Sequence, residues 1–249
     1  MSSNKILGID VGGSGIKGAV VDVETGKLTV ERHRIATPHP ATPENIANII
    51  KKIAGHFDYE GKIGVGYPAV IKNGIIKTAT NIDKSNIEID ANELFSKITG
   101  NEVCVINDAD AAGIAENSFG HGKNVGGTVL FITVGTGIGS ALFVNGKLVP
   151  NTEFGHLFMH NGMIAEKYTS DLTRKSEDLK WSKWGNRFNK YLQHLELLLS
   201  PKLFIVGGGV SKKMDKFKDS ITVNTPVKPA MLRNEAGIIG AAMSMATER

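Results

Sequence analysis

Residues 5–23 read KILGIDVGGSGIKGAVVDV, and residues 128–144 read TVLFITVGTGIGSALFV. Each stretch is an apolar run, a glycine loop and a second apolar run, followed by a turn and a Gly-Lys-Leu exit. Short runs rich in valine and isoleucine that end at glycines are typical of strands joined by tight turns. The repetition predicts that one supersecondary unit has been duplicated, and therefore that the chain forms two related lobes.

Helical periodicity alternates with further short apolar runs along the rest of the chain. Helices are expected over residues 43–57, 90–100, 109–119, 181–199 and 235–246, with strands over 62–68, 101–108 and 202–206. This alternation predicts an α/β architecture whose functional groups lie at strand ends. We expect a smaller N-terminal lobe of residues 1–106, joined by the C-terminal helix 235–249, and a larger lobe of residues 107–234.

The composition excludes several classes of protein. With 249 residues, 41% hydrophobic and 22% charged, the chain is neither disordered nor collagen-like. Its single cysteine, Cys104, rules out an internal disulfide and favours a reducing cytoplasmic location. We expect no membrane span and no signal peptide. The net charge of +4 permits an anionic substrate but does not indicate nucleic-acid binding.

The glycine loops are candidate phosphate-binding sites. Residues 13–18 match the G-x-G-x-x-G dinucleotide pattern, but a strand follows them instead of a helix, so a dinucleotide site is disfavoured. Glycines also let backbone amides approach an anion closely, although a tight hairpin is the plainer alternative. The candidate donor-binding residues are Gly12, Gly13, Ser14, Gly15, Lys17, Thr136, Gly137, Gly139, Gly207, Gly208 and Gly209.

Asp108 is the candidate catalytic base. It follows an expected strand, where a carboxylate can take a proton from a substrate hydroxyl. The alternative is that it only caps the helix that follows. Asp10 leads the first glycine loop in the matching position, where a carboxylate could hold a Mg²⁺ ion that bridges phosphate oxygens.

Glu153, His156 and Glu166 form a second constellation, in TEFGHLFMHNGMIAEKY. Even with His160 they make a poor zinc site, because no thiolate is near. Carboxylates and an imidazole among glycines suit hydrogen bonds to sugar hydroxyls, although a surface loop with satisfied polar groups is the alternative.

A basic ridge is expected on the long helix of the C-terminal half. This helix has an apolar stripe, and a basic residue directly precedes each of four residues of that stripe. The basic residues are Lys180, Lys183, Arg187 and Lys190. Such a ridge could guide an extended polyanion, and a solvated lysine-rich face is the alternative.

The motifs GIDVGGSGIKG, GYP, INDADAAG, TVGTGIGSA, TEFGH, AEKY and IVGGGVSK occur in this order, within a resemblance that runs from about Ile6 to Ala246. This ordered set resembles the ROK sugar-kinase family, and most closely its polyphosphate glucokinase branch. The resemblance implies an actin-like, ribonuclease-H-type two-lobed fold with duplicated βββαβα units, a homodimer, and Asp108 as the catalytic base. It implies sugar contacts at Gly66, Pro68, Asn81, Asn107, Asp108, Glu153, His156 and Glu166.

Zinc is not implied. Many ROK proteins carry a cysteine-rich zinc motif between the histidine of E-x-G-H and the next glutamate, but residues 160–165 here contain no cysteine. That absence is typical of the polyphosphate branch.

The resulting hypothesis is phosphoryl transfer from inorganic polyphosphate, or secondarily ATP, to the 6-hydroxyl of glucose. One rival is a strictly ATP-dependent hexokinase. Another is a sugar-sensing repressor, disfavoured because only a few residues precede the first strand and because Asp108 is retained.

Overall fold

The computed structural model describes residues 4–80, 82–160 and 162–247, which fold as two compact units. Unit 1 comprises Met1–Ala115 and Glu235–Arg249, and unit 2 comprises Glu116–Asn234. Unit 1 therefore extends further along the chain than the expected boundary after residue 106, because the first part of the helix that starts at Asp108 packs with it. The division into functional lobes stays a prediction.

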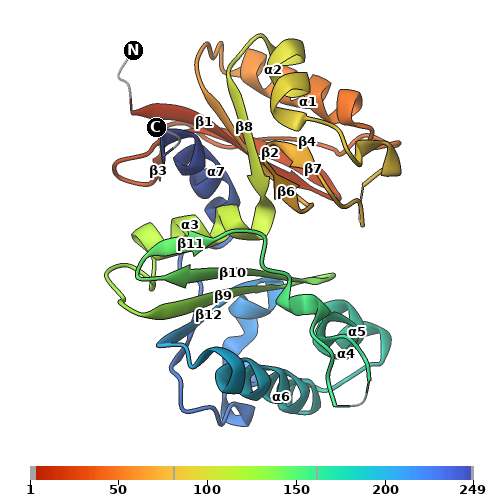
Figure 1. The fold of residues 1–249 in the computed structure, drawn as a ribbon, viewed down its shortest axis with the longest axis vertical. Coiled ribbons are helices and arrows are strands. Elements are labelled where there is room, and N and C mark those ends of the chain that lie inside the picture. The colour runs from red at the N-terminus through yellow and green to blue at the C-terminus, as the bar shows by residue number, and fades with distance from the viewer. Residues whose placement is uncertain (1–3, 81, 161, 248–249) are drawn as a thin grey trace. The chain divides into compact units, whose positions relative to one another are not determined.

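The sheet of unit 1 starts as an antiparallel meander and ends as a parallel sheet (Figure 1). Its order is β3-β2-β1-β5-β8, with β4 also paired to β2. The strands are β1 (Lys5–Gly12), β2 (Gly15–Asp22), β3 (Lys27–Leu28), β4 (His33–Ile35), β5 (Ile63–Tyr67) and β8 (Val103–Asn107). A separate two-stranded sheet pairs β6 (Ile71–Lys72) with β7 (Ile75–Ile76). The segment after the first hairpin forms two short strands, β3 and β4, and residues 29–32 between them are not part of a strand.

Helices pack against the sheet of unit 1. They are α1 (Pro43–His56), α2 (Ala91–Thr99), the first part of α3 (Asp108–Phe119) and α7 (Ala236–Thr247). Apolar side chains of α1 and α2 form one core with those of β1, β5 and β8. Gly8 and Gly64, paired across β1 and β5, allow the backbone of α7 to approach, since a Cβ on Gly64 would lie 1.7 Å from the Ala241 carbonyl oxygen. Neither glycine was singled out from the sequence.

The sheet of unit 2 repeats the plan of unit 1, with the order β11-β10-β9-β12-β13. Its strands are β9 (Thr128–Val134), β10 (Ile138–Val144), β11 (Lys147–Val149), β12 (Leu203–Gly208) and β13 (Val227–Pro229). β9, β10 and β11 form the antiparallel meander, whereas β12 and β13 run parallel to β9. The expected duplication is confirmed, and Asn145 and Gly146 turn the second hairpin with positive φ as the Asn-Gly pair predicts.

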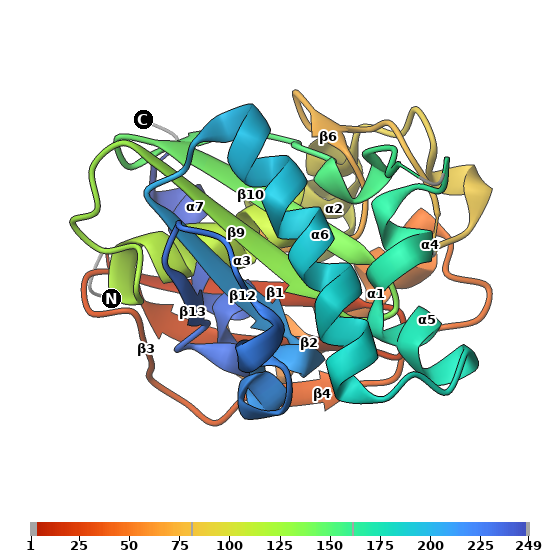
Figure 2. The same cartoon turned by 90° about the horizontal axis from the view of Figure 1, so that it is seen from below.

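Helix α6 (Trp181–Leu199) covers the sheet of unit 2 (Figure 2). Its fully buried side chains include Trp184, Phe188 and Leu195, as its periodicity predicts. Lys180 is not part of the helix but its N-cap, which corrects its place on the expected ridge. The short helices α4 (Ala165–Thr169) and α5 (Asp171–Ser176) precede it.

Short 3₁₀ helices complete the described elements, at Lys84–Asn86, Phe154–His156, Gly209–Lys216, Lys218–Ser220 and Arg233–Glu235. In the part of the chain that the structure describes, no helix is both long enough and apolar enough to cross a membrane.

Candidate functional site

The first glycine loop lies at the tip of the β1–β2 hairpin in unit 1. Asp10 and Lys17 face each other across the hairpin, and the Lys17 Nζ lies 3.3 Å from the Asp10 Oδ2. Gly12 pairs with Gly15, so Gly13 and Ser14 form the turn itself. A Cβ on Gly13 would meet no atom within 4 Å, and the loop therefore leaves open space at its tip.

Two residues at this loop were missed by the sequence reasoning. Arg34 of β4 pairs with Lys17 of β2 and donates from Nη2 to the Ser14 carbonyl oxygen at 2.6 Å. Thr37 donates from its hydroxyl to the Gly12 carbonyl oxygen at 2.5 Å. The loop thus carries two cationic side chains, Lys17 and Arg34, beside its glycines. Only the register of β4 on β2 brings Arg34 there, and nothing in the sequence fixes that register.

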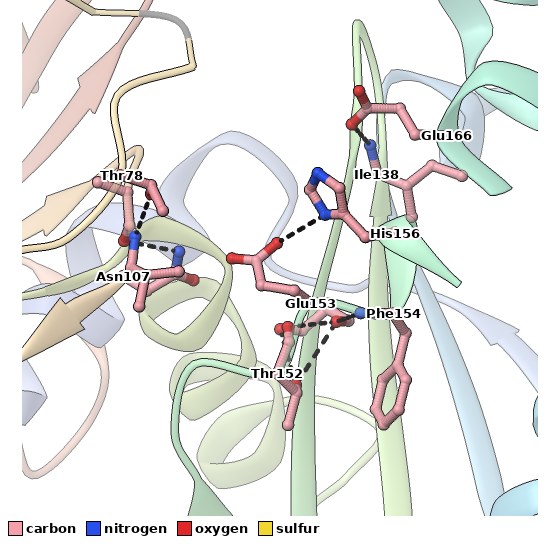
Figure 3. Close-up of polar contacts among 11 residues, drawn as sticks. Thr78, Asn107, Ile138, Thr152, Glu153, Phe154, His156 and Glu166 are labelled. Atoms are coloured by element: carbon pink, nitrogen blue, oxygen red, sulfur yellow. Dashed lines mark hydrogen bonds and ion pairs between the residues drawn. The ribbon is translucent and has the colours of Figure 1, made fainter. Parts of the chain in front are cut away.

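The start of α3 separates the roles of Asn107 and Asp108. The Asn107 Oδ1 accepts hydrogen bonds from the amides of Ala109 and Asp110 at 2.9 and 3.0 Å, so Asn107 is the helix cap. Its Nδ2 donates to the Ala69 carbonyl oxygen at 3.0 Å, which fixes the side chain (Figure 3). Asp108 accepts from the Ala109 amide at 2.8 Å through Oδ1. The role of Asp108 as a catalytic base stays a prediction.

The loop that follows β5 packs under this helix. Gly66 is buried at the end of β5, and a Cβ there would lie 3.3 Å from the Ala111 side chain. Pro68 is half-buried in the same loop, near the Ala69 carbonyl that holds Asn107. Asn81, the remaining expected sugar contact of unit 1, lies outside the described residues.

Unit 2 brings Glu153, His156 and Glu166 together. The Glu153 Oε2 lies 3.6 Å from the His156 Nδ1 (Figure 3). Burial raises the pKa of the Glu153 carboxyl above its ordinary value; the imidazole of His156 opposes this, and the carboxylate of Glu166 adds to it. Two carboxylates and an imidazole in mutual electrostatic contact form a cluster of hydrogen-bonding groups suited to hydroxyls.

Ser140 holds the backbone on either side of Glu153. Its hydroxyl donates to the Thr152 carbonyl oxygen at 2.5 Å and accepts from the Phe154 amide at 3.0 Å. Ser140 is almost fully buried within β10, where a hydroxyl needs partners. It positions Glu153, although the sequence reasoning did not single it out.

Glu166 closes the second glycine loop. Its Oε2 accepts from the Ile138 amide at 3.0 Å, and a Cβ on Gly137 would lie 2.4 Å from the same oxygen. Gly137 is therefore required for space and not for an unusual backbone angle. The amide of Gly135 is also engaged, by the Gly137 carbonyl at 2.9 Å. Thr136 lies between these two glycines at the turn, and Gly139 pairs with Thr133 inside the hairpin.

The third glycine segment ends β12 in unit 2. Gly208 has φ +74, and a Cβ there would lie 2.3 Å from the Val134 carbonyl oxygen, so only glycine fits. Gly207 packs on the Phe131 ring, while Gly209 begins the 3₁₀ helix with nothing within 4 Å of an added Cβ. Ser211 secures the turn by donating to the Gly208 carbonyl oxygen at 2.8 Å.

The expected basic ridge is less uniform than its spacing suggests. Lys183 and Lys190 are exposed on α6. Arg187, by contrast, donates from Nη2 to the Glu177 Oε2 at 2.6 Å and from Nη1 to the Tyr168 carbonyl oxygen at 3.2 Å. Its guanidinium also stacks over the Tyr168 ring. Arg187 thus makes structural contacts within unit 2, while the polyphosphate ridge itself stays a prediction.

No group of three or more His, Cys, Asp or Glu side chains within residues 4–80, 82–160 and 162–247 is placed to hold a metal ion. The expected absence of zinc stays a prediction.

Comparison with known proteins places the chain in a family. The model of the ROK family matches residues 6–169. The chain is 46% identical over 239 residues to a polyphosphate glucokinase of Mycobacterium tuberculosis, covering 96% of this chain and 90% of that protein.

Solved structures agree with this match. An inorganic polyphosphate/ATP-glucomannokinase from Arthrobacter sp. superposes with a TM-score of 0.94 at 45% identity, covering 99% of this chain and all of that one. A ROK family glucokinase from Streptomyces griseus, solved with glucose and AMPPNP, has a TM-score of 0.81 at 24% identity and supports the fold alone. The α/β fold is the actin-like one that the resemblance implied, and the chain belongs to the ROK family.

Proposed function

We propose that this protein transfers a phosphoryl group from inorganic polyphosphate, and secondarily from ATP, to the 6-hydroxyl of glucose. One observation carries the proposal: the likeness to the mycobacterial polyphosphate glucokinase extends over 96% of the chain and so includes both units. The product is glucose 6-phosphate, and the donor leaves shortened by one phosphoryl group.

Asp108 is the general base of this reaction. Its carboxylate accepts the proton of the 6-hydroxyl as the new bond to phosphorus forms and the bond to the leaving phosphate breaks. Two features support this role. Asn107 supplies the helix cap, and Asp108 is the first residue of α3, so the helix fixes the position of its backbone. Catalysis of this kind depends mainly on positioning and electrostatics.

The proposed glucose contacts are the hydrogen-bonding residues that the family resemblance implies. Asn107, Gly66 and Pro68 are the proposed contacts in unit 1, and Asn81 is proposed from the resemblance alone. Glu153, His156 and Glu166 are the proposed contacts in unit 2, where their carboxylates accept from sugar hydroxyls. The close approach of Glu153 to His156 supports a common role for these two side chains.

The donor phosphates lie against the glycine loops. Gly12, Gly13, Ser14 and Gly15, with the cations of Lys17 and Arg34 beside them, form the more strongly anion-binding loop. The second loop offers the backbone groups of Thr136, Gly137 and Gly139 and the hydroxyl of Thr136. The third offers the backbone groups of Gly207, Gly208 and Gly209. Exposed Lys183 and Lys190 are proposed to attract a long polyphosphate chain.

A divalent cation, proposed to be Mg²⁺, fits the residues of the first loop. Kinases hold Mg²⁺ by one or two carboxylates together with donor phosphates and water. Asp10 offers one such carboxylate, which is partly exposed and held only by a 3.3 Å ion pair to Lys17. When bound, the cation would neutralise charge on the phosphate oxygens.

A homodimer and a cytoplasmic location are proposed from the family resemblance.

The proposal is tested by measuring phosphorylation of glucose with long-chain polyphosphate and with ATP in parallel, each with Mg²⁺. We expect turnover with both donors and a higher kcat/KM for polyphosphate. Turnover with ATP alone would replace the proposal by an ATP-dependent glucokinase. No turnover with either donor, with glucose binding retained in calorimetry, would favour a sugar sensor.

A further inference from the structure

The chain passes between its two compact units twice. The first crossing lies inside α3, between Ala115 and Glu116, and the second lies between Asn234 and Glu235, in the 3₁₀ turn Arg233–Glu235. Asp108 is on the same helix as the first crossing, two turns earlier. Glu116 and the proposed base therefore belong to one continuous helix.

A hydrogen bond accepted by Glu116 links the first crossing to the segment just before the second. Its side chain is fully buried, and its Oε1 accepts a hydrogen bond of 2.6 Å from the Leu232 amide, just before the second crossing. Both residues belong to unit 2. The bond thus joins positions 116 residues apart in sequence, near the places where the chain enters and leaves this unit.

The carboxyl group is not explained by stability alone. The Glu116 Oε2 is enclosed and has no hydrogen-bond partner among the described residues, and burial of such an atom is unfavourable. Gly120 makes room for it, since a Cβ there would lie 2.0 Å from Oε2. An apolar side chain would fill the same space without this cost, but it could not hold the Leu232 amide.

The backbone next to Leu232, and the contact between α3 and α7, also restrict movement near the two crossings. Arg233, directly after Leu232, has φ +51, a conformation that a side-chain-bearing residue adopts at some cost and that its surroundings must hold. In unit 1, Gly240 of α7 lies directly on the Ala111 carbonyl of α3, with no room for a Cβ. Helix α3 is thus held to the returning chain in each unit separately.

We propose that Glu116 is a positioning residue for the phosphoryl transfer, which makes the two crossings act as one joint. The bond from the Leu232 amide to Glu116 holds the helix α3, whose first residue is Asp108, and so limits movement of that carboxylate. This inference rests on the proposed function and extends it to a residue that touches neither substrate.

Two substitutions separate the reach of the side chain from its charge. Glu116→Gln keeps an oxygen at the same distance from the Leu232 amide, whereas Glu116→Asp keeps the carboxylate but withdraws it by one methylene. We expect Glu116→Asp to lower kcat by about tenfold or more, because small misplacements of reacting groups are costly, and Glu116→Gln to stay within about threefold of the wild type. Binding of glucose to each variant, measured by calorimetry, is expected to change much less than kcat.

Glu196 provides a matched control. Its Oε1 accepts from the Thr225 amide, also at 2.6 Å and also within unit 2, but away from both crossings. Glu196→Asp makes the same change to the same kind of bond, and we expect it to lower Tm while leaving kcat within about twofold. If Glu116→Asp likewise lowers only Tm, or if Glu116→Gln is as impaired as Glu116→Asp, the proposal is wrong.

Hydrogen exchange separates this inference from the proposed function. The amides of residues 230–235 should exchange faster in Glu116→Asp than in the wild type. Their exchange rate should not change in Glu196→Asp. Both expectations hold whichever reaction the protein catalyses. A wild type without glucose kinase activity would remove the proposed function, while this exchange pattern would still support the joint. Unchanged exchange at these residues in Glu116→Asp would overturn the joint, even in an active kinase.

Discussion

The two glycine hairpins have the same topology but different surroundings. β1–β2 and β9–β10 hold the same place in sheets of the same strand order. At the first loop, the cations of Lys17 and Arg34 lie beside open space over Gly13. At the second loop, the carboxylate of Glu166 takes the Ile138 amide and fills the space over Gly137.

This difference shows how a duplicated unit can acquire two functions. The backbone plan repeats, but the neighbours that decide the charge at each loop come from segments that do not repeat, β4 in unit 1 and α4 in unit 2. On the proposed function, the first loop binds the phosphates of the donor, and the second lies beside the hydroxyl-bearing substrate. Fold alone would not have separated these roles.

The largest expected effect concerns Asp108, the proposed base, which lies in unit 1. Asp108→Asn should lower kcat by about 10²–10⁴-fold with glucose binding retained, because an amide keeps the shape but cannot accept the proton. Steady-state kinetics and calorimetry measure the two effects separately. Asp90→Asn, at the N-cap of α2 in the same unit, is the control and should remain within about twofold, since an amide also caps a helix. Near-normal turnover of Asp108→Asn would show that this residue only helps to begin the helix and is not the base.

The cationic loop is tested next. Arg34→Gln should raise the KM for the phosphoryl donor by roughly tenfold or more, since charge-assisted hydrogen bonds contribute about 1.5–3 kcal/mol. The KM for glucose should change little. Arg32→Gln, an exposed neighbour on the same segment, serves as the control. An increase in the KM for glucose alone would reverse the assignment of the two loops.

Matched alanine substitutions compare the space over each loop. Gly137→Ala places a methyl group against the Glu166 carboxylate and should lower kcat/KM for glucose by about tenfold, the effect expected of a 1–3 kcal/mol steric clash. Gly13→Ala meets nothing and should leave Tm unchanged. Kinetics and thermal unfolding of both variants provide the comparison. Equal effects of the two substitutions on kcat/KM for glucose would remove the distinction between the loops.

The smallest effect is expected on the surface of α6. Lys183→Ala with Lys190→Ala should weaken binding of long polyphosphate a few-fold, and ATP less, with a reduced dependence on salt concentration, because a long polyanion releases counterions from many cations. Lys51→Ala with Lys52→Ala, two exposed positions of α1, is the matched control. Arg187 is left unchanged because of its bond to Glu177. If binding of polyphosphate and of ATP weakens equally and only slightly, these lysines belong to a solvated helix face and do not bind polyphosphate.

Much of the fold could be predicted because the signals are local. Apolar runs ending at glycines gave the duplicated hairpins, and three- and four-residue spacing gave the buried face of α6. Asn145 and Gly146 specified their turn by their tolerance of positive φ. The family, read from motif order, is confirmed by the comparisons.

The remaining features depend on pairings between distant segments. Arg34 reaches the first loop only through the register of β4 on β2, and Arg187 is bound by a glutamate ten residues before it. Glu116 reads as an ordinary polar position of a helix, yet it is buried against a segment 116 residues later. Local pattern carries no information on such contacts.

The position of the transferred phosphoryl group tests the central claim most directly. Polyphosphate, glucose, Mg²⁺ and the wild-type protein should be followed by ³¹P nuclear magnetic resonance, with a second sample that lacks glucose. The account predicts that glucose 6-phosphate accumulates in the first sample and that little orthophosphate appears in the second. Orthophosphate at the same rate in both samples, or phosphate on another hydroxyl of glucose, would contradict it.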